Sequence, residues 1–172
     1  MFEMPVANPG GNVTWRRPSA TTAAAGVPAV GTLGYFHGFN TAPKQLKRVA
    51  FDGASESVMN DGGTLSYVQT SPIVAEGGVV YWVSGDGTLQ VTDEQPSLQW
   101  QASLGINNVT ASPNFDCNRS GGGGILYVPS TTGHVQSIVV DSSRLANTSW
   151  PKWQHDAQNS GNADFPLNAG CP

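Results

Sequence analysis

The chain has 172 residues, with 8 Lys and Arg against 12 Asp and Glu, which gives a formal net charge of −4. Charged residues make up 12% of the sequence, about half of the usual ~25%, whereas Gly (21) and Pro (12) are frequent. The acidic balance argues against nucleic-acid binding as the main function, and the lack of helical periodicity excludes a helical bundle. No apolar run approaches the ~18 residues that a membrane span requires. These exclusions leave an all-β protein with many turns.

The first 25 residues contain one candidate strand, Asn12-Val13-Thr14-Trp15. We expect it to be the outer strand of a unit that precedes the rest of the chain. The opening residues show neither a basic region nor an apolar stretch, so no signal peptide is visible. Two interpretations follow, a cytosolic protein or a chain that begins inside a longer one, and the repeats described next favour the second.

Three stretches of the chain share the same order of landmarks. Each opens on a proline, and these prolines are 44 and 41 residues apart: Pro28, Pro72 and Pro113. An aromatic strand follows, with tyrosines spaced by 46 residues in both intervals: Tyr35, Tyr81 and Tyr127. A third strand ends on an acidic residue: Asp52, Asp93 and Asp141. A fourth strand follows a turn, within SESVMND, SLQWQAS and TSWPKWQ, so we predict three units of four strands each.

The middle unit shows this pattern most clearly. A short apolar strand at 73–75 stops at Glu-Gly-Gly, and the continuous apolar run at 79–83 is typical of a strand covered on both faces. Ser84-Gly85-Asp86-Gly87 predicts a tight hairpin, because glycine and aspartate readily adopt turn conformations. Strands at 88–92 and 98–101 then alternate apolar and polar residues. The unit is predicted to be an antiparallel four-stranded meander.

A unit of this size cannot bury both of its faces alone, and four strands per period of about 40 to 50 residues are typical of β-propeller blades. We predict an all-β propeller of about three four-stranded antiparallel blades, at 26–69, 70–110 and 111–156, after a segment at 1–25 and before a tail at 157–172. A β-sandwich would explain the strands but not the recurring landmarks. Closed propellers usually have at least four blades, so we expect a partial ring that further blades or another copy complete.

The middle unit resembles the repeats of the pyrroloquinoline-quinone-like, or quinoprotein dehydrogenase-like, β-propellers. The matching features are a Ser-Pro strand, a Val-Val-Tyr strand, a Gly-x-Asp-Gly hairpin, a strand ending near Asp and a closing Trp. In this unit they fall on Pro72, Tyr81, Asp86, Gly87 and Trp100. The third unit keeps Pro113, Tyr127 and Trp150 but inserts residues 116–124 in its first hairpin, and the first unit lacks the Gly-Asp-Gly turn. The tail WPKWQHDAQNSGN is similar to the segment that follows the last blade in exported bacterial propellers of this type.

The resemblance implies a fold more firmly than an activity. Quinoprotein dehydrogenases hold their quinone with a vicinal Cys-Cys ring, a Trp floor and a Ca²⁺ ion bound by Glu, Asn and Asp, and none of these motifs is present. We therefore predict no catalytic, cofactor-binding or metal-binding residues. The predicted function is a non-enzymatic scaffold or binding module of an exported bacterial protein, periplasmic, cell-surface or secreted. The alternatives are a fragment of a quinone-dependent oxidoreductase whose catalytic residues lie outside this chain, and a carbohydrate-binding surface protein.

The two cysteines, Cys117 and Cys171, allow two interpretations. They are either unrelated free thiols or one disulfide that ties the C-terminal tail to a Gly-rich loop. Both lie in segments rich in turn residues, DCNRSGGGG and NAGCP, where a covalent link would reduce fraying. We suspect the disulfide.

The tryptophans divide into two groups. Trp15, Trp100 and Trp150 recur at the same place in the repeat, which indicates packing between blades. Trp82 and Trp153 break this pattern and are candidates for a binding face, although interblade packing is an alternative for them too. The expected partners are a protein, a surface polymer or missing propeller blades, with no nucleic acid and no membrane span. In the tail, His155 and Asp156 are expected to form local hydrogen bonds.

Overall fold

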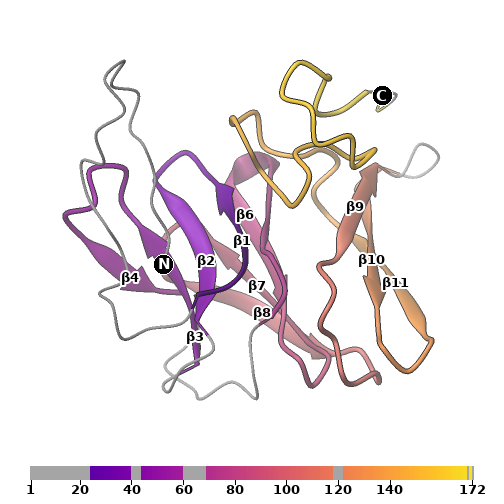
Figure 1. Ribbon diagram of the computed structural model, residues 1–172. Coiled ribbons are helices and arrows are strands. Elements are labelled where there is room, and N and C mark those ends of the chain that lie inside the picture. Colours follow the sequence, from indigo (N-terminus) through magenta and orange to yellow (C-terminus); the bar gives the residue numbers. More distant parts are fainter. Residues whose placement is uncertain (1–23, 40–43, 60–68, 118–121, 170, 172) are drawn as a thin grey trace.

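The computed structural model describes residues 24–39, 44–59, 69–117, 122–169 and 171. The predicted strand Asn12–Trp15 lies outside this part of the chain. The described residues form an all-β structure without an α-helix, in which three antiparallel sheets follow one another along the sequence (Figure 1). The prediction of an all-β fold built from consecutive antiparallel sheets is therefore confirmed.

The first sheet has the order β1-β2-β3-β4. Its strands are β1 (Ala24–Val30), β2 (Tyr35–Phe39), β3 (Gln45–Val49) and β4 (Glu56–Val58). The register pairs Phe36 with Arg48 and Tyr35 with Val49. Phe36 belongs to the core that joins this sheet to the next one. Phe36 rather than Tyr35 therefore occupies the place that Tyr81 has in the middle sheet, and the predicted landmark is wrong by one residue.

The middle sheet has the order β5-β6-β7-β8. Its strands are β5 (Ile73–Ala75), β6 (Val79–Val83), β7 (Thr88–Asp93) and β8 (Leu98–Ser103), and a 3-10 turn at Glu76–Gly78 joins the first two. The predicted hairpin is present, because the Gly87 amide donates to the Ser84 carbonyl oxygen. The carboxylate of Asp86 accepts from the Thr88 amide at 3.1 Å, which forms an Asx turn.

The third sheet has the order β11-β10-β9. Its strands are β9 (Asn114–Cys117), β10 (Gly124–Pro129) and β11 (Val135–Val140). The predicted fourth strand of this unit, TSWPKWQ at 148–154, is not a strand. This part of the chain instead crosses to the first and middle sheets, where its backbone accepts hydrogen bonds from Val30 and Val74.

Apolar side chains cover both faces of the middle sheet. One face packs against the third sheet, in a cluster that includes Ile73, Tyr81, Val83, Leu89, Val91, Phe115, Leu126, Val128 and Val140. The other face packs against the first sheet, in a cluster of Ala29, Phe36, Leu46, Met59, Val74, Val80, Trp82 and Ala146. Each fully buried large side chain contributes about 1.5–3 kcal/mol through the hydrophobic effect. This double coverage explains the continuous apolar run that the sequence shows in β6.

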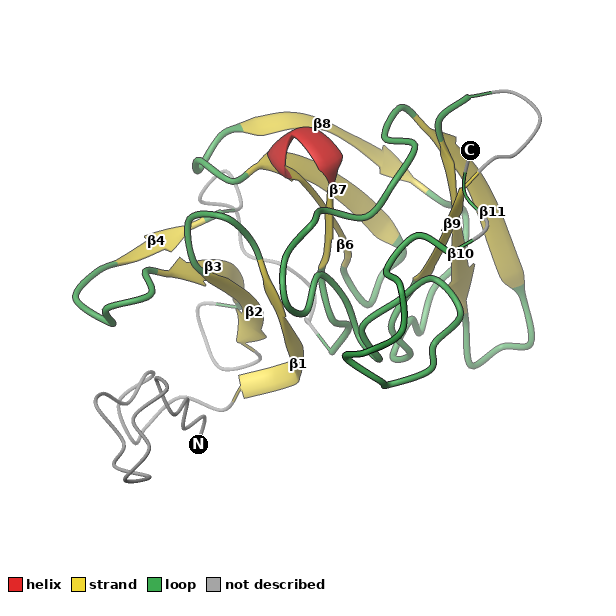
Figure 2. Ribbon diagram, turned by 90° about the horizontal axis from the view of Figure 1, so that it is seen from above, coloured by secondary structure: helices red, strands yellow, loops and turns green. Residues whose placement is uncertain are grey.

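The sheets spread like a fan from the C-terminal tail. Figure 2 shows the three sheets splayed apart, with β4, β8 and β11 on the outside and β1 and β9 nearer to the loops at the lower centre. The next section describes the contacts at the narrow side of this fan.

Candidate functional site

The first strands of the three sheets are linked by one hydrogen bond that occurs twice. The Val27 amide donates to Ser71 Oγ at 2.7 Å, and the Ser71 amide donates to Ser112 Oγ at 2.9 Å. In each case the donor is the residue before the repeated proline, and the acceptor is the corresponding serine of the next sheet. In each Ser-Pro pair the serine therefore links neighbouring sheets, and the proline directly precedes the first strand of its own sheet.

The tail lies along the edge strands of all three sheets. The Val30 amide donates to the Trp150 carbonyl oxygen at 2.7 Å, and the Val74 amide donates to the Pro151 carbonyl oxygen at 2.8 Å. In the third sheet, Asn114 Nδ2 lies 3.5 Å from the carbonyl oxygen of Ala157. Val30 and Val74 are the second residues after Pro28 and Pro72, and Asn114 is the first residue after Pro113, so the tail contacts the first strand of each unit. This contact begins well before residue 157, where the sequence placed the start of the tail.

A buried lysine holds the tail in its conformation. Lys152 is 0% exposed, and its Nζ donates to the Trp153 carbonyl oxygen at 2.7 Å, to the Asp156 carbonyl oxygen at 3.0 Å and to Asn159 Oδ1. Three acceptors match the three N–H groups of an ammonium group. Burial lowers the pKa of Lys152 from 10.5 to about 8, and the nearby Asp156 opposes this shift.

The predicted local hydrogen bonds of Asp156 are present. Its carboxylate is 0% exposed and accepts from the Gln158 amide at 2.8 Å and from the amide and hydroxyl of Ser160. Burial raises the pKa of this carboxyl, but the hydrogen bonds outweigh that effect and the net shift is downward. His155 Nδ1 lies 3.5 Å from Asp156 Oδ2, which is too long for a strong hydrogen bond.

The suspected disulfide joins Cys117, at the end of β9, to Cys171, and the two Cα atoms are 5.6 Å apart. The described residues include no free cysteine. Asn168 adds two hydrogen bonds to the backbone of Leu145, one in each direction. The end of the tail is therefore fixed covalently to the third sheet and by hydrogen bonds to Leu145, which precedes the tail in the chain.

Of the two candidate binding-face tryptophans, only Trp153 is accessible. Its side chain is 42% exposed and borders a pocket of about 300 Å³ that lies beside the first strands of the sheets. This pocket is lined by small residues, Gly26, Ala111 and Ser112 among them. Trp82 is 0% exposed and packs between the first and middle sheets, so the prediction that it lies on a binding face is wrong. Of the two predictions left open for Trp82, packing between sheets is the correct one.

The tryptophans expected to pack between blades behave differently. Trp100 is 39% exposed on β8, the outer edge strand of its sheet. Trp150 lies in the tail, where its ring packs against the His155 ring with centroids 5.0 Å apart. Neither supports the prediction of a shared interblade position, because the outer strand is a solvent-facing edge in one unit and absent in the other. Trp15 lies outside the described residues.

The two equivalent tyrosines differ in burial. Tyr81 is 2% exposed and donates to Ser142 Oγ at 2.9 Å, and burial raises the pKa of its phenol. Tyr127, at the same place in the third sheet, is 37% exposed. Val135 and Val139 on the neighbouring strand are 66% and 68% exposed. The face of the third sheet that corresponds to the buried face around Tyr81 is thus open to solvent.

A buried glutamate that sequence reasoning missed joins the first two sheets. Glu94 is 4% exposed and accepts from the amides of Thr32 and Leu33 at 2.9 and 2.7 Å, and from the Thr32 hydroxyl at 3.0 Å. Its carbonyl oxygen accepts from the Arg48 guanidinium at 2.6 Å. The sequence offered only a weak signal, namely an acidic pair at the end of β7 where the other units have a single Asp. Glu94 borders a second pocket, of about 420 Å³.

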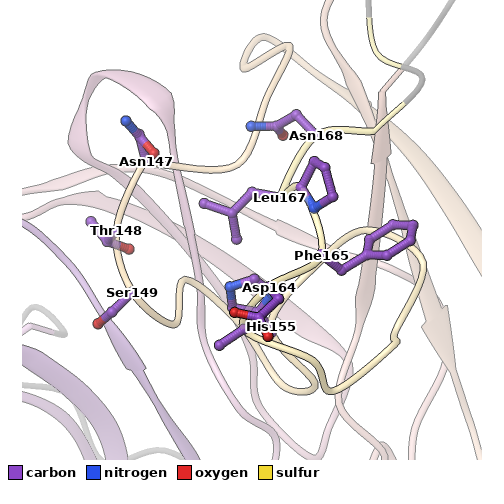
Figure 3. Close-up of a pocket in the computed structure, with 10 residues that line it drawn as sticks. Asn147, Thr148, Ser149, His155, Asp164, Phe165, Leu167 and Asn168 are labelled. Carbon is purple, nitrogen blue, oxygen red and sulfur yellow. The ribbon is translucent and has the colours of Figure 1, made fainter.

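The largest of the three pockets described here, about 670 Å³, lies within the tail. Figure 3 shows Asn147, Thr148 and Ser149 on one side of it and Phe165 on the other, with His155 between them. No cluster of three or more His, Cys, Asp or Glu side chains suited to a metal ion occurs among the described residues. In the same part of the chain no helix is long and apolar enough to cross a bilayer. No protein-family model matches the chain, and no curated protein is significantly similar to it.

Proposed function

We propose that the chain forms three consecutive blades of a quinoprotein-like β-propeller and acts as a non-enzymatic binding scaffold in an exported protein. The observation that carries this proposal is the amide-to-serine hydrogen bond that recurs between neighbouring sheets at Ser71 and Ser112. A bond that repeats at the same position of successive units is what rotation about a common axis produces, and a β-sandwich gives no reason for it.

The tail supports the same arrangement. Its backbone or side-chain partners are Val30, Val74 and Asn114, which lie on the first strands of three successive units. In a propeller the first strands of the blades surround the axis, so the tail takes the place of a plug at the axis. In this arrangement the third unit has no outer strand, because the residues that would form it bind to the first strands near the axis instead.

The open face of the third sheet fits a further blade or a partner sheet. Tyr127 and Val139 lie on this face, and the corresponding face around Tyr81 in the middle sheet is covered by its neighbour. Contiguous exposed apolar residues of this kind usually mark an interaction surface. Missing propeller blades are the occupant that the repeat favours.

The binding surface in this proposal is the mouth of the axis beside Trp153. An indole that is 42% exposed beside a pocket lined by small residues offers a flat apolar contact with a hydrogen-bond donor at its edge. Tryptophan is enriched among the residues that dominate protein interfaces. A protein segment or a surface polymer that reaches the axis would contact this side chain first.

The disulfide supports an exported location. Disulfides persist in oxidising compartments and are rare in the cytosol of most organisms. The link between Cys117 and Cys171 holds the tail against the third sheet, which gives it a structural purpose.

Site-specific photocrosslinking in the native host tests the function. A photoreactive phenylalanine analogue at position 153 is expected to trap one discrete partner, whereas the same analogue at Gln101, on the exposed outer edge of the middle sheet, is expected to trap none. Equal labelling at both positions would contradict a specific binding face. Dye-linked alcohol oxidation that depends on added quinone and Ca²⁺ would overturn the non-enzymatic assignment in favour of the oxidoreductase alternative.

A further inference from the structure

The largest of the three pockets, which lies within the tail, is not used by the proposed scaffold function. The pocket of about 670 Å³ is formed by two stretches, 147–149 and 163–168, together with His155 (Figure 3). Ligand sites in proteins commonly have volumes of about 300–1,000 Å³. The pocket is therefore large enough for a small polar molecule such as a saccharide of one or two rings.

The backbone at His155, which lines the pocket, has an unfavourable conformation. Its φ is 73° and that of the preceding Gln154 is 58°, so two consecutive non-glycine residues are left-handed. Such conformations cost about 1–3 kcal/mol each and persist only where the surroundings enforce them. Here the Lys152 ammonium fixes the turn through three acceptors, and the Trp150 ring packs on the imidazole. The histidine is 3% exposed, so the fold places a buried imidazole at the pocket wall.

The other polar side chains of the pocket have unused hydrogen-bonding capacity. The Asp164 carboxylate, the Asn147 amide and the Ser149 hydroxyl make no side-chain hydrogen bond within the described residues, although the backbone of Asp164 is bonded to Asn162. Figure 3 shows Asn147 and Ser149 on the side opposite Phe165. The Phe165 ring is 38% exposed. Polar groups that both donate and accept and an exposed aromatic residue thus line the same pocket.

We propose that this pocket binds a neutral saccharide. A sugar hydroxyl both donates and accepts, so an acceptor-only carboxylate (Asp164), two donor–acceptor groups (Asn147 and Ser149) and an imidazole together match a set of adjacent hydroxyls. The apolar face of a sugar ring stacks on an exposed aromatic ring such as Phe165. An anion would be repelled by Asp164. A polyvalent cation would find one carboxylate in the pocket and no second one to share it with.

This inference goes beyond the scaffold function and uses a different surface, since Trp153 is not part of the pocket. The test is isothermal titration calorimetry of the full chain with a panel of neutral mono- and disaccharides of glucose, galactose, mannose and N-acetylglucosamine. Spermidine and inorganic phosphate serve as the charged probes. The variants are Phe165→Ala and Asp164→Ala, with Trp153→Ala as the matched control that removes an exposed aromatic outside the pocket.

The expected result is that at least one neutral saccharide binds with a Kd below about 10 mM, and that each pocket variant weakens it by about tenfold or more. Trp153→Ala is expected to leave this Kd within about twofold. Asp164 and Phe165 are exposed, so an unchanged urea midpoint is expected to show that the variants still fold. The proposal is overturned if no saccharide of the panel binds, if binding survives both pocket variants, or if spermidine or phosphate binds in preference. Loss of saccharide binding in Trp153→Ala alone would assign the sugar to the mouth of the axis, whereas a missing crosslink at position 153 leaves the pocket unaffected.

Discussion

The buried ammonium of Lys152 makes the stability of the protein depend on pH in the alkaline range. The pKa of this group is lowered from 10.5 in the unfolded chain to about 8 in the folded protein. Between these two values the unfolded chain binds a proton that the native protein does not, so the free energy of unfolding rises with pH. The stabilisation is fully present above the unfolded pKa and is lost as the pH falls through the folded pKa.

The magnitude follows from the two pKa values. The full slope is about 1.4 kcal/mol per pH unit, and integration from about pH 7.5 to about pH 9.5 gives a gain of about 2 kcal/mol. Lys152→Met removes the titrating group and retains an unbranched side chain of similar length. The variant is expected to show no such gain, and at neutral pH it is destabilised because buried acceptors such as the Asp156 carbonyl oxygen lose their donor.

Urea unfolding followed by intrinsic fluorescence at several pH values measures this effect. The wild-type midpoint is expected to rise over this range, while the midpoint of Lys152→Met stays level. Other groups that titrate in the same range contribute equally to both proteins, so the difference between them isolates Lys152. Parallel curves for wild type and variant would refute the burial and the hydrogen bonds assigned to this side chain.

Three further predictions concern stability. Cys117→Ser opens a loop of 54 residues and is expected to lower the free energy of unfolding by about 4 kcal/mol on the chain-entropy model. Thiol titration of the denatured, unreduced wild type is expected to find neither Cys117 nor Cys171 as a free thiol. Gly87→Ala is expected to be strongly destabilising, because φ is +80° and a Cβ would lie 1.9 Å from a backbone oxygen. The control Gly105→Ala, at φ +68° with open space around it, is expected to cost only about 1 kcal/mol. Equal melting temperatures of the two variants would contradict this prediction. Glu94→Gln replaces one carboxylate oxygen with a donor that faces backbone amides and is expected to cost about 1–3 kcal/mol in urea unfolding, and an unchanged midpoint would exclude the proposed link between sheets.

The middle sheet was predictable from local signals. Its strands are short, glycine and Asp86 mark its hairpin, and its apolar residues follow the burial of its two faces, so the predicted and observed strands coincide within a few residues. The first sheet shows how far such signals reach. Tyr35 and Phe36 are adjacent aromatics, and only the pairing register decides that Phe36 enters the core.

The third unit and the candidate sites depend on contacts between distant parts of the chain. TSWPKWQ has the composition of an outer strand, but long-range hydrogen bonds to Val30 and Val74 draw it to the opposite side of the sheets. Trp82 alternates correctly with Tyr81, yet both faces of β6 are covered, so alternation could not assign either residue to solvent. Lys152 carried no local signal and Glu94 only a weak one, because a buried charge is identified by the acceptors or donors that surround it.

Amide hydrogen exchange measured by NMR tests the repeated link between sheets most directly. In the wild type the amides of Val27 and Ser71 are expected to be protected, since they donate to Ser71 Oγ and Ser112 Oγ. Ser71→Ala is expected to speed exchange at Val27, and Ser112→Ala at residue 71, each by about five- to tenfold for the loss of a hydrogen bond worth about 1 kcal/mol. Unprotected amides at both positions in the wild type, or protection at residue 71 that Ser112→Ala leaves unchanged, would contradict the proposed arrangement of the three sheets as successive blades.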